Sequence, residues 1–401
     1  MDRVVITGVG IVSAAGANGE ESRLSLRDVK TGIRPIPISE KLPLGFAGRV
    51  RGFDLKVYVE DKKTYVDPTS ALALASSALA LEDAGLDLGK HQNPTLVGVA
   101  IGSDQGCLDS MVMFQEKFRE QGAPSIHPTL VTHACVHAPC SLVAAQWGMK
   151  GPCMGFAGGR NASFQSLAFA ADSLRQDRAE VILAGGTETL SRISIKGWRT
   201  LGVLSPGFHG QNEACMPYDR RRNGWVLGEG ACVLSMETAR HARRRKAEPL
   251  AEVLGWGASF GKNRSKALSR AALRALQVAR VEPDDLGWVV GSACSDPEMD
   301  REEWLAVRDI LNGAGVPLSS LVGYTGETAG AQGAISMGLG LLAARDDMVA
   351  ATCLLEELEE DCSVRILHGV PDELKRDKIL FLSLDPSGAC WAFVVRKLRK
   401  A

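Results

Sequence analysis

The sequence lacks three features that would each point to a particular class of protein. The 46 lysines and arginines nearly balance the 47 aspartates and glutamates, so the net charge is only −1. Proteins that bind nucleic acid or anionic membranes are usually basic, and we therefore expect neither partner. No stretch approaches the run of about eighteen apolar residues that spans a membrane, and none of the ten cysteines forms a CxxC pair.

The positions of the cysteines and the first residues point to an intracellular protein. Several cysteines, such as Cys153, Cys232 and Cys390, lie in apolar segments, where a free thiol behaves as a small hydrophobic group. The opening MDRVVITGVG has no basic segment followed by a long apolar run, and it predicts a buried strand. Its TGVG lacks the rest of a dinucleotide-binding GxGxxG motif. We expect a soluble, cytoplasmic protein without metal or cofactor.

The chain has 401 residues and is 45% apolar, which is enough for a sizeable core. Short β-rich runs alternate with segments rich in alanine and leucine, which predicts an α/β protein with covered sheets. The predicted strands are 3–9, 95–101, 153–157, 181–187, 230–237, 250–257, 288–293, 348–355 and 390–397. The predicted helices are 69–84, 162–176, 266–279, 301–312 and 329–344.

An internal repeat organises these segments. Residues 70–106 resemble 269–296, since both indicate a helix, an acidic turn, a strand and a loop of small residues. Residues 155–186 resemble 323–354 in the same way, with a tight turn, a helix, a charged turn and a strand. The first half carries an extra segment near 107–150. A duplicated α/β unit explains the length, and its two tight turns should converge on one site.

The first of these turns, in GPCMGFAGGRNASFQSL, has the pattern of a nucleophile elbow. An apolar run leads into Gly158 and Gly159, and a helix is predicted just after Arg160. Such a turn often places a nucleophile at a helix N-terminus, where an anion is stabilised. Here the displayed residue is an arginine.

Several motifs resemble the β-ketoacyl synthase family. The segments are ITGVGIVSAAG at the N-terminus, AEVILAGGTETLS after the predicted elbow helix, and MPYDRRRNGWVLGEG, which is similar to the family's PFD…R.G…GEG stretch. Pro297, Asp300 and Glu303 fit the residues after the family's first catalytic histidine. The resemblance covers nearly the whole chain. It implies a thiolase-like fold of two duplicated βαβαβαββ halves, 1–243 and 244–401, in a layered αβαβα core.

The same resemblance implies that the catalytic residues of the family are absent. The cysteine that takes the acyl chain falls on Arg160, the first histidine on Ser292, the lysine on Val322 and the second histidine on Glu327. The glycine-rich GFGG loop is replaced by residues 385–388, DPSG. Claisen condensation needs the nucleophile and the groups that stabilise the enolate, so we expect none here.

The pattern resembles the chain length factor subunits of type II polyketide synthases. In these, glutamine usually replaces the cysteine, in a GGQ context that Gly158-Gly159-Arg160 resembles. The resemblance implies a heterodimer with an active ketosynthase, control of the acyl tunnel depth, and docking of an acyl carrier protein. Strand 153–157 would then pair with its counterpart in the partner. An acyltransferase or hydrolase of different chemistry, or an acyl-binding module, remains an alternative.

A buried arginine at a helix N-terminus needs a counter-charge. Because Glu327 occupies the equivalent turn of the second half, we predict an Arg160–Glu327 ion pair filling the former catalytic chamber. Backbone carbonyls or another acid could bind Arg160 instead, or it could form an anion site. Cys294 is the candidate nucleophile for an enzyme of altered chemistry, although no His or Lys is placed to activate it.

The extra segment offers two more groups of residues. Met111, Met113, Phe114 and Phe118 have helical spacing, which fits either an ordinary core stripe or side chains that reach into a partner's tunnel. His127, His133 and His137 have spacings that suit a core or an interface better than a metal. The basic run 240–246 fits a solvated helix end or a dock for an acidic partner.

Overall fold

The computed structural model describes residues 2–36, 42, 44–60, 65–90, 93–206 and 214–399. Its strands are β1 Val4–Ser13, β2 Arg34–Pro35, β3 Phe46–Ala47, β4 Val97–Gly102, β5 Cys153–Phe156, β6 Val181–Glu188, β7 Gly230–Thr238, β8 Ala251–Phe260, β9 Leu286–Gly291, β10 Leu318–Ser320, β11 Met348–Val349, β12 Asp372–Glu373, β13 Lys378–Leu384 and β14 Ala389–Lys397. Its α-helices are α1 Gly19–Arg27, α2 Pro68–Asp83, α3 Leu108–Gln121, α4 Pro128–His133, α5 Ala138–Gln146, α6 Ala162–Arg175, α7 Arg192–Thr200, α8 Ala239–Arg244, α9 Arg264–Ala279, α10 Pro297–Leu311, α11 Val322–Thr325 and α12 Gln332–Arg345.

Ten of the strands form one continuous sheet with internal symmetry. Its order is β10-β9-β13-β14-β8-β1-β7-β6-β4-β5, so each half contributes five strands and the halves join where β8 and β1 pair antiparallel. The first half runs β1, α2, β4, α5, β5, α6, β6, β7, and the second runs β8, α9, β9, α10, β10, α12, β13, β14. The predicted duplication of a βαβαβαββ unit is confirmed by this matching order.

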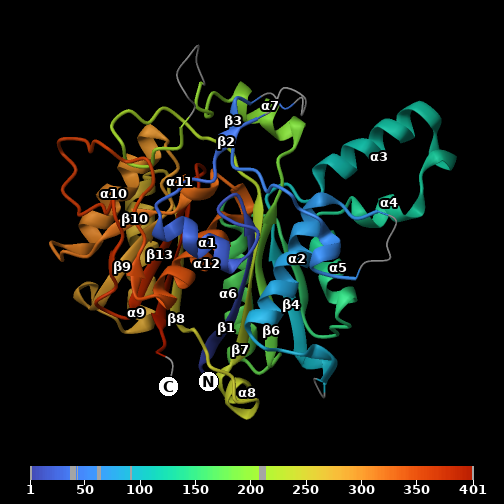
Figure 1. Cartoon of the computed structure of the whole chain (residues 1–401), viewed down its shortest axis with the longest axis horizontal. Helices are drawn as coiled ribbons and strands as arrows, with labels where there is room; N and C mark the ends of the chain where they lie inside the picture. The colour runs from blue at the N-terminus through green and yellow to red at the C-terminus, as the bar shows by residue number, and fades with distance from the viewer. Residues whose placement is uncertain are drawn as a thin grey trace.

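Helices form the layers around and between the two halves of the sheet. α2 and α5 cover the outer face of the first half, and α9, with α10 packed on it, covers that of the second. α6 and α12 contact each other, and α12 touches strands of both halves. Figure 1 shows these two helices in the interior of the molecule. The layering is the αβαβα arrangement that the sequence predicted.

Local sequence signals explain where several of these elements begin and how closely they pack. Asp67 caps α2 through the backbone N–H of Thr69, and proline occupies the first turn. Asp296 caps α10 in the same way, again with proline in the first turn. Gly10 of β1 lies so close to α2 that a Cβ would come within 1.8 Å of the Ser76 carbonyl oxygen. The glycines of VVITGVG therefore let α2 lie directly on β1.

The predicted strand 348–355 is wrong beyond its first two residues. Only Met348 and Val349 are in a strand, and this strand, β11, pairs with the short β12 outside the main sheet. The position equivalent to β6 is taken by β13, which pairs with β9 and β14. Residues 350–353 are fully buried outside any strand, and Thr352 makes only an isolated bridge to His368. The apolar character of this segment therefore reflects burial and not membership of the main sheet.

The extra segment of the first half consists of α3 and α4. These two helices project from the body of the molecule, as the teal ribbon in Figure 1 shows. The predicted insertion, 107–150, also included α5, but α5 occupies the place in the element order that α10 has in the second half. Among the described residues, no helix is both long enough and apolar enough to cross a membrane.

Candidate functional site

The elbow lies between β5 and α6, where the sequence predicted it. Gly159 has φ +62°, a conformation that glycine adopts without steric cost. A Cβ on this residue would come within 2.5 Å of an Asp385 carboxylate oxygen. Glycine is therefore required at this position because its φ is positive and because a Cβ would collide with Asp385. The turn directs the side chain of Arg160 into the interior, where only 4% of the residue is exposed.

The guanidinium of Arg160 makes four hydrogen bonds to groups from the second half. Nε donates to Glu327 Oε1 at 2.9 Å and Nη2 donates to Glu327 Oε2 at 2.6 Å, which makes a bidentate ion pair. Nη2 also donates to the carbonyl of Ser292 at 2.8 Å, and Nη1 donates to the carbonyl of Leu384. The structure thus combines two of the predicted arrangements, the pair with Glu327 and binding to backbone carbonyls.

Glu327 is held as firmly as its partner. It is 2% exposed, and its Oε1 also accepts the backbone N–H of Ala329 at 3.0 Å. Burial alone would lower the pKa of the Arg160 guanidinium, but the neighbouring acidic groups, Glu327 foremost and Asp385 among them, together more than offset this, so the pKa is raised. The arginine is therefore a permanent cation whose charge is balanced inside the chamber.

Ser292 and Val322, the other two positions matched to the family's catalytic residues, have structural roles. Ser292 donates its hydroxyl to Glu303 Oε1 at 2.7 Å and accepts the backbone N–H of Leu384 at 3.0 Å. Its carbonyl binds Arg160, as described above. Val322 is fully buried at the start of α11, in the same apolar cluster as Cys294. Neither side chain has a free polar group directed at the elbow.

Asp385 is a member of this site that sequence reasoning did not identify. Its Oδ2 accepts the backbone N–H of Arg160 at 3.0 Å and therefore places a second carboxylate at the start of α6. A negative charge there complements the helix dipole, which the arginine side chain opposes. The signal was present in the replacement of the family's GFGG loop by DPSG, because an aspartate new to that loop brings a charge.

Cys294, the alternative nucleophile, is unsuited to that role. It is fully buried, and its backbone N–H donates to Asp300 Oδ1 at 2.8 Å. Burial raises the pKa of the thiol well above its usual value, although the nearby Arg160 acts in the opposite direction. A neutral thiol is a weak nucleophile. With its charges paired and its one thiol neutral, this group of residues is arranged for structural stability and offers no activated nucleophile.

The four candidate tunnel residues lie on the projecting helix α3. Ser110 is the only buried residue of α3, so the stripe of Met111, Met113 and Phe114 is not part of this chain's own core. Phe118 is 53% exposed and stacks on Phe114 with ring centroids 6.4 Å apart. The interpretation as an ordinary core stripe is therefore wrong, because α3 has little of its own chain to pack against.

The three histidines of the extra segment have separate positions. His127 caps α4, where its Nδ1 accepts the backbone N–H of Thr129 at 3.3 Å. His133 is buried against the ring of Tyr65, and His137 is exposed at the start of α5. Across the described ranges, no group of three or more His, Cys, Asp or Glu side chains is arranged to hold a metal ion.

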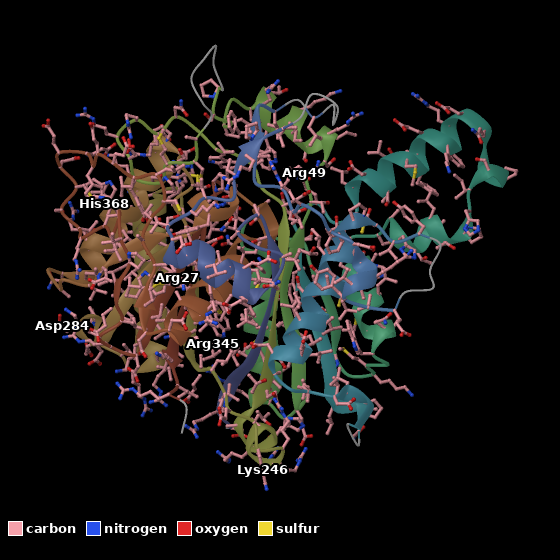
Figure 2. The ribbon with its side chains drawn as sticks, viewed as in Figure 1. Arg27, Arg49, Lys246, Asp284, Arg345 and His368 are labelled. Carbon is pink, nitrogen blue, oxygen red and sulfur yellow. The ribbon has the colours of Figure 1, made fainter. Side chains whose placement is uncertain are left out.

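The basic run at 240–246 is largely neutralised within the chain. Arg240 pairs with Asp177 at 2.9 Å, Arg244 with Glu180 at 2.7 Å, and Arg245 with Glu237 at 2.6 Å. Lys246 lies at the outer edge of the molecule beside α8, as Figure 2 shows. These ion pairs support the interpretation as a solvated helix end over a dock for an acidic partner.

Comparisons with known proteins agree with this architecture. The family described as "Beta-ketoacyl synthase, N-terminal domain" matches residues 1–242, and its C-terminal domain matches residues 250–356. A 3-oxoacyl-[acyl-carrier-protein] synthase 2 of Coxiella burnetii is 28% identical, over 99% of each chain. The tetracenomycin polyketide synthase ketoacyl synthase alpha subunit of Streptomyces glaucescens is also 28% identical, over 94% of this chain and 93% of its own.

The solved structures include the ishigamide ketosynthase/chain length factor. It superposes with a TM-score of 0.91 at 23% identity, covering 99% of this chain and 100% of its own. At this identity the likeness concerns the fold alone. It confirms the thiolase-like fold that the sequence predicted.

Proposed function

Since the chain belongs to the β-ketoacyl synthase family, we propose that it is a catalytically silent member of that family. The observation that carries the proposal is the buried ion pair of Arg160 and Glu327. These residues occupy the positions that the family resemblance assigns to the nucleophilic cysteine and to a catalytic histidine. A guanidinium cannot accept an acyl group, and its charged partner is committed to holding it.

The proposed role is that of a chain length factor, which pairs with an active ketosynthase and helps to set the depth of its acyl tunnel. The tetracenomycin relative is named as a subunit of a polyketide synthase, and the ishigamide neighbour is named as a ketosynthase/chain length factor. The acyl carrier protein would dock on the joint surface of the two subunits. In this proposal the chain contributes part of the docking surface and helps to set the tunnel depth, and the partner subunit catalyses the reaction.

Two exposed elements support the proposed heterodimer. β5 is an edge strand paired only with β4, and Met154 on it is 44% exposed. The carbonyl of Pro152 accepts the backbone N–H of Val99 in β4, and that of Phe156 accepts the N–H of Ser103 just after β4. The alternating residues Cys153 and Gly155 therefore present their backbone groups to the free edge. An unpaired strand edge is suited to strand pairing with another subunit, and the exposed Phe118 on α3 is a second apolar group that a partner could cover.

A probe experiment tests whether the chain is silent. The full chain is co-purified with its ketosynthase partner and treated with a thioester-reactive probe that labels activated cysteines. We expect label on the partner alone, and no malonyl decarboxylation by this chain when it is assayed without the partner. Label on Cys294, with loss of activity in Cys294→Ala, would instead support an acyltransferase or hydrolase of altered chemistry.

The tunnel role has its own test in the reconstituted pair. Met111, Met113, Phe114 and Phe118 are replaced by alanine one at a time, and the product lengths are measured by mass spectrometry. At least one replacement should lengthen the product, because a smaller side chain deepens the cavity it closes. Leu273→Ala, an exposed residue on the outer helix α9, serves as the control. Unchanged products in all four variants would reject gating by this helix.

A further inference from the structure

A groove with a volume of about 570 Å³ lies at one end of the sheet, where β13 begins and β14 ends. Among the described residues, its lining holds two carboxylates, those of Asp285 and Asp377, against six cations. The cations are Lys375, Arg376, Lys378, Arg396, Lys397 and Arg399. The chain as a whole has a net charge of −1, so the groove is a local excess of positive charge that the composition does not reveal.

The antiparallel pairing of β13 with β14 brings these cations together. Two basic runs meet there, KRDK at 375–378, which leads into β13, and RKLR at 396–399, at the end of β14. The register places Lys378 directly opposite Arg396. Like charges directly opposite each other on paired strands destabilise a sheet, so the stability of this pairing gives no reason for cations at both positions.

Three of the six cations have a counter-charge within the chain. The pairs are Arg396–Glu252 at 2.5 Å, Lys378–Asp377 at 3.8 Å and Lys397–Asp347. These ion pairs restrict the three side chains to the vicinity of the chain's own carboxylates.

The other three cations, Lys375, Arg376 and Arg399, are exposed. No ion pair joins any of them to a residue in the described part of the chain. The guanidinium of Arg376 makes one long hydrogen bond, from Nη1 to the carbonyl of Leu286 at 3.5 Å. These three groups can therefore bind an anion that approaches from outside the molecule.

We propose that this groove docks an acidic segment of a partner protein, a stretch of chain with several aspartates or glutamates. The exposed cations flank two neighbouring strands, and such strands lie about 4.8 Å apart, so the positive charge is spread along the groove. Carboxylates spaced along a peptide can meet several cations at once, and the arginine fork binds a carboxylate through two parallel hydrogen bonds. A single small anion would leave part of this charge unmatched.

The two carboxylates in the lining favour a peptide over a nucleic acid. A nucleic acid carries a phosphate at every nucleotide, so Asp285 and Asp377 would repel part of it. A peptide can place uncharged residues opposite these two carboxylates. The net charge of −1 also gives a nucleic acid no general attraction to the rest of the surface.

The groove lies away from the subunit interface proposed above. In the sheet, β13 and β14 belong to the half that is remote from the edge strand β5. Figure 1 shows β9 and β13 on one side of the molecule, with α3 and α4 projecting on the other. A segment bound in the groove would not compete with a subunit paired along β5, and the inference does not depend on the proposed function.

The test measures how the full-length chain binds a fluorescent peptide in which glutamate alternates with serine, by fluorescence anisotropy. We expect binding at low ionic strength that weakens as the salt is raised to about 0.15 M, because exposed charges are screened. Lys375→Glu combined with Arg399→Glu should weaken binding by about tenfold or more, because two attractive contacts become repulsive. Lys375→Gln combined with Arg399→Gln should weaken it less, and this milder variant serves if the charge reversal impairs folding.

Lys262→Glu combined with Lys266→Glu is the matched control. Both lysines are exposed where α9 begins, beyond the opposite end of β8 from the groove, and the two substitutions change the net charge by the same amount. The control should bind the peptide as the unaltered chain does. Equal weakening in the groove and control variants, or no binding by the unaltered chain, would overturn the inference.

A competition experiment distinguishes a peptide from a small phosphate compound as the occupant. Unlabelled peptide and inorganic pyrophosphate are each titrated against the bound fluorescent peptide. We expect the unlabelled peptide to displace it at the lower concentration, because its carboxylates are spaced along the groove. If pyrophosphate is the stronger competitor, the groove is a site for a small phosphate compound and the proposal of an acidic segment is wrong.

Discussion

At the scale of single residues, Arg160 stands at the family's nucleophile position and has a structural role there. Its guanidinium makes contacts with Glu327, Ser292 and Leu384, all of which belong to the second half of the chain. A buried ion pair need not stabilise a protein more than an apolar pair of similar size, because both charges lose their hydration. Removing one member, however, leaves the other buried and unpaired. Arg160 and Glu327 are therefore constrained together, and neither can change alone at low cost.

This constraint gives the first prediction. Arg160→Ala and Glu327→Ala should each lower the free energy of unfolding by about 3–5 kcal/mol, whereas the double variant Arg160→Met, Glu327→Leu should lower it much less. Urea unfolding of the three variants measures the difference. Arg308→Ala is the control, since its pair with Asp309 is half-exposed on both sides and contributes about 1 kcal/mol or less. If Arg160→Ala or Glu327→Ala lowers the free energy of unfolding no more than Arg308→Ala does, the prediction is wrong.

Glu188, at the end of β6, provides a pH prediction. Burial raises its pKa to about 8, with a further contribution from the charge of Asp104, although backbone N–H groups act in the opposite direction. The folded state therefore holds a proton that the unfolded state releases near pH 4. The stabilisation that this bound proton gives to the folded state is fully present below about pH 4, and it is lost as the pH rises through about 8.

We therefore expect the free energy of unfolding to fall by a few kcal/mol between about pH 5 and pH 8. Glu188→Gln, which mimics the protonated acid, should show a smaller fall over the same interval. Denaturant unfolding of both proteins at the two pH values measures the effect. Equal falls in the two proteins would show that Glu188 does not hold its proton in the folded state.

At the scale of elements, the sequence predicted what local patterns determine and missed what distant pairing determines. The strand at 181–187 and the helix at 162–176 agree with β6 and α6 to within one residue at each end, because both have clear apolar patterns. β13 was missed and 348–355 was overpredicted, because the long connection after α12 moves the pairing strand further along the chain. Which apolar run joins the sheet depends on its neighbours, β9 and β14, and these are distant in sequence.

The same division applies to the candidate site. The duplication and the family resemblance placed Arg160 opposite Glu327, since both predict where two turns meet. They did not reveal that Asp385 accepts the backbone N–H of Arg160, because that contact depends on the path of the loop after β13. The lack of packing around α3 was equally invisible, since an apolar stripe at helical spacing looks the same whether its own core or a partner covers it.

The edge strand β5 gives a prediction at this scale. Met154→Asp would place an unpaired charge in the proposed interface, so we expect the chain to lose its partner in co-expression pull-downs. Its own free energy of unfolding should change by about 0.5 kcal/mol or less, because Met154 is half-exposed in the single chain. Leu273→Asp, on the outer face of α9, should bind the partner normally. Retained binding by Met154→Asp would argue against pairing through β5.

At the scale of the whole molecule, the two halves share one core. The largest apolar cluster combines residues of β1, β6 and β7 with residues of α12, β13 and β14. Phe164 of α6 packs edge-on against Phe393 of β14, with ring centroids 4.9 Å apart. We therefore expect the proposed halves, 1–243 and 244–401, to be repeats of one architecture that are not stable on their own, because each leaves part of this cluster uncovered without the other.

A shared core predicts a single unfolding transition for the full chain. Phe164→Ala should lower the free energy of unfolding by about 3–5 kcal/mol, because the side chain is fully buried and its loss leaves a cavity. The transition should stay single, since α6 supports both halves at once. Circular dichroism and tryptophan fluorescence are compared along one urea titration, with Phe118→Ala on the exposed face of α3 as a control that should change little. Two separated transitions, or a signal change seen by only one of the two probes, would show that the halves unfold independently. The ion pair of Arg160 and Glu327 would then join two separate units.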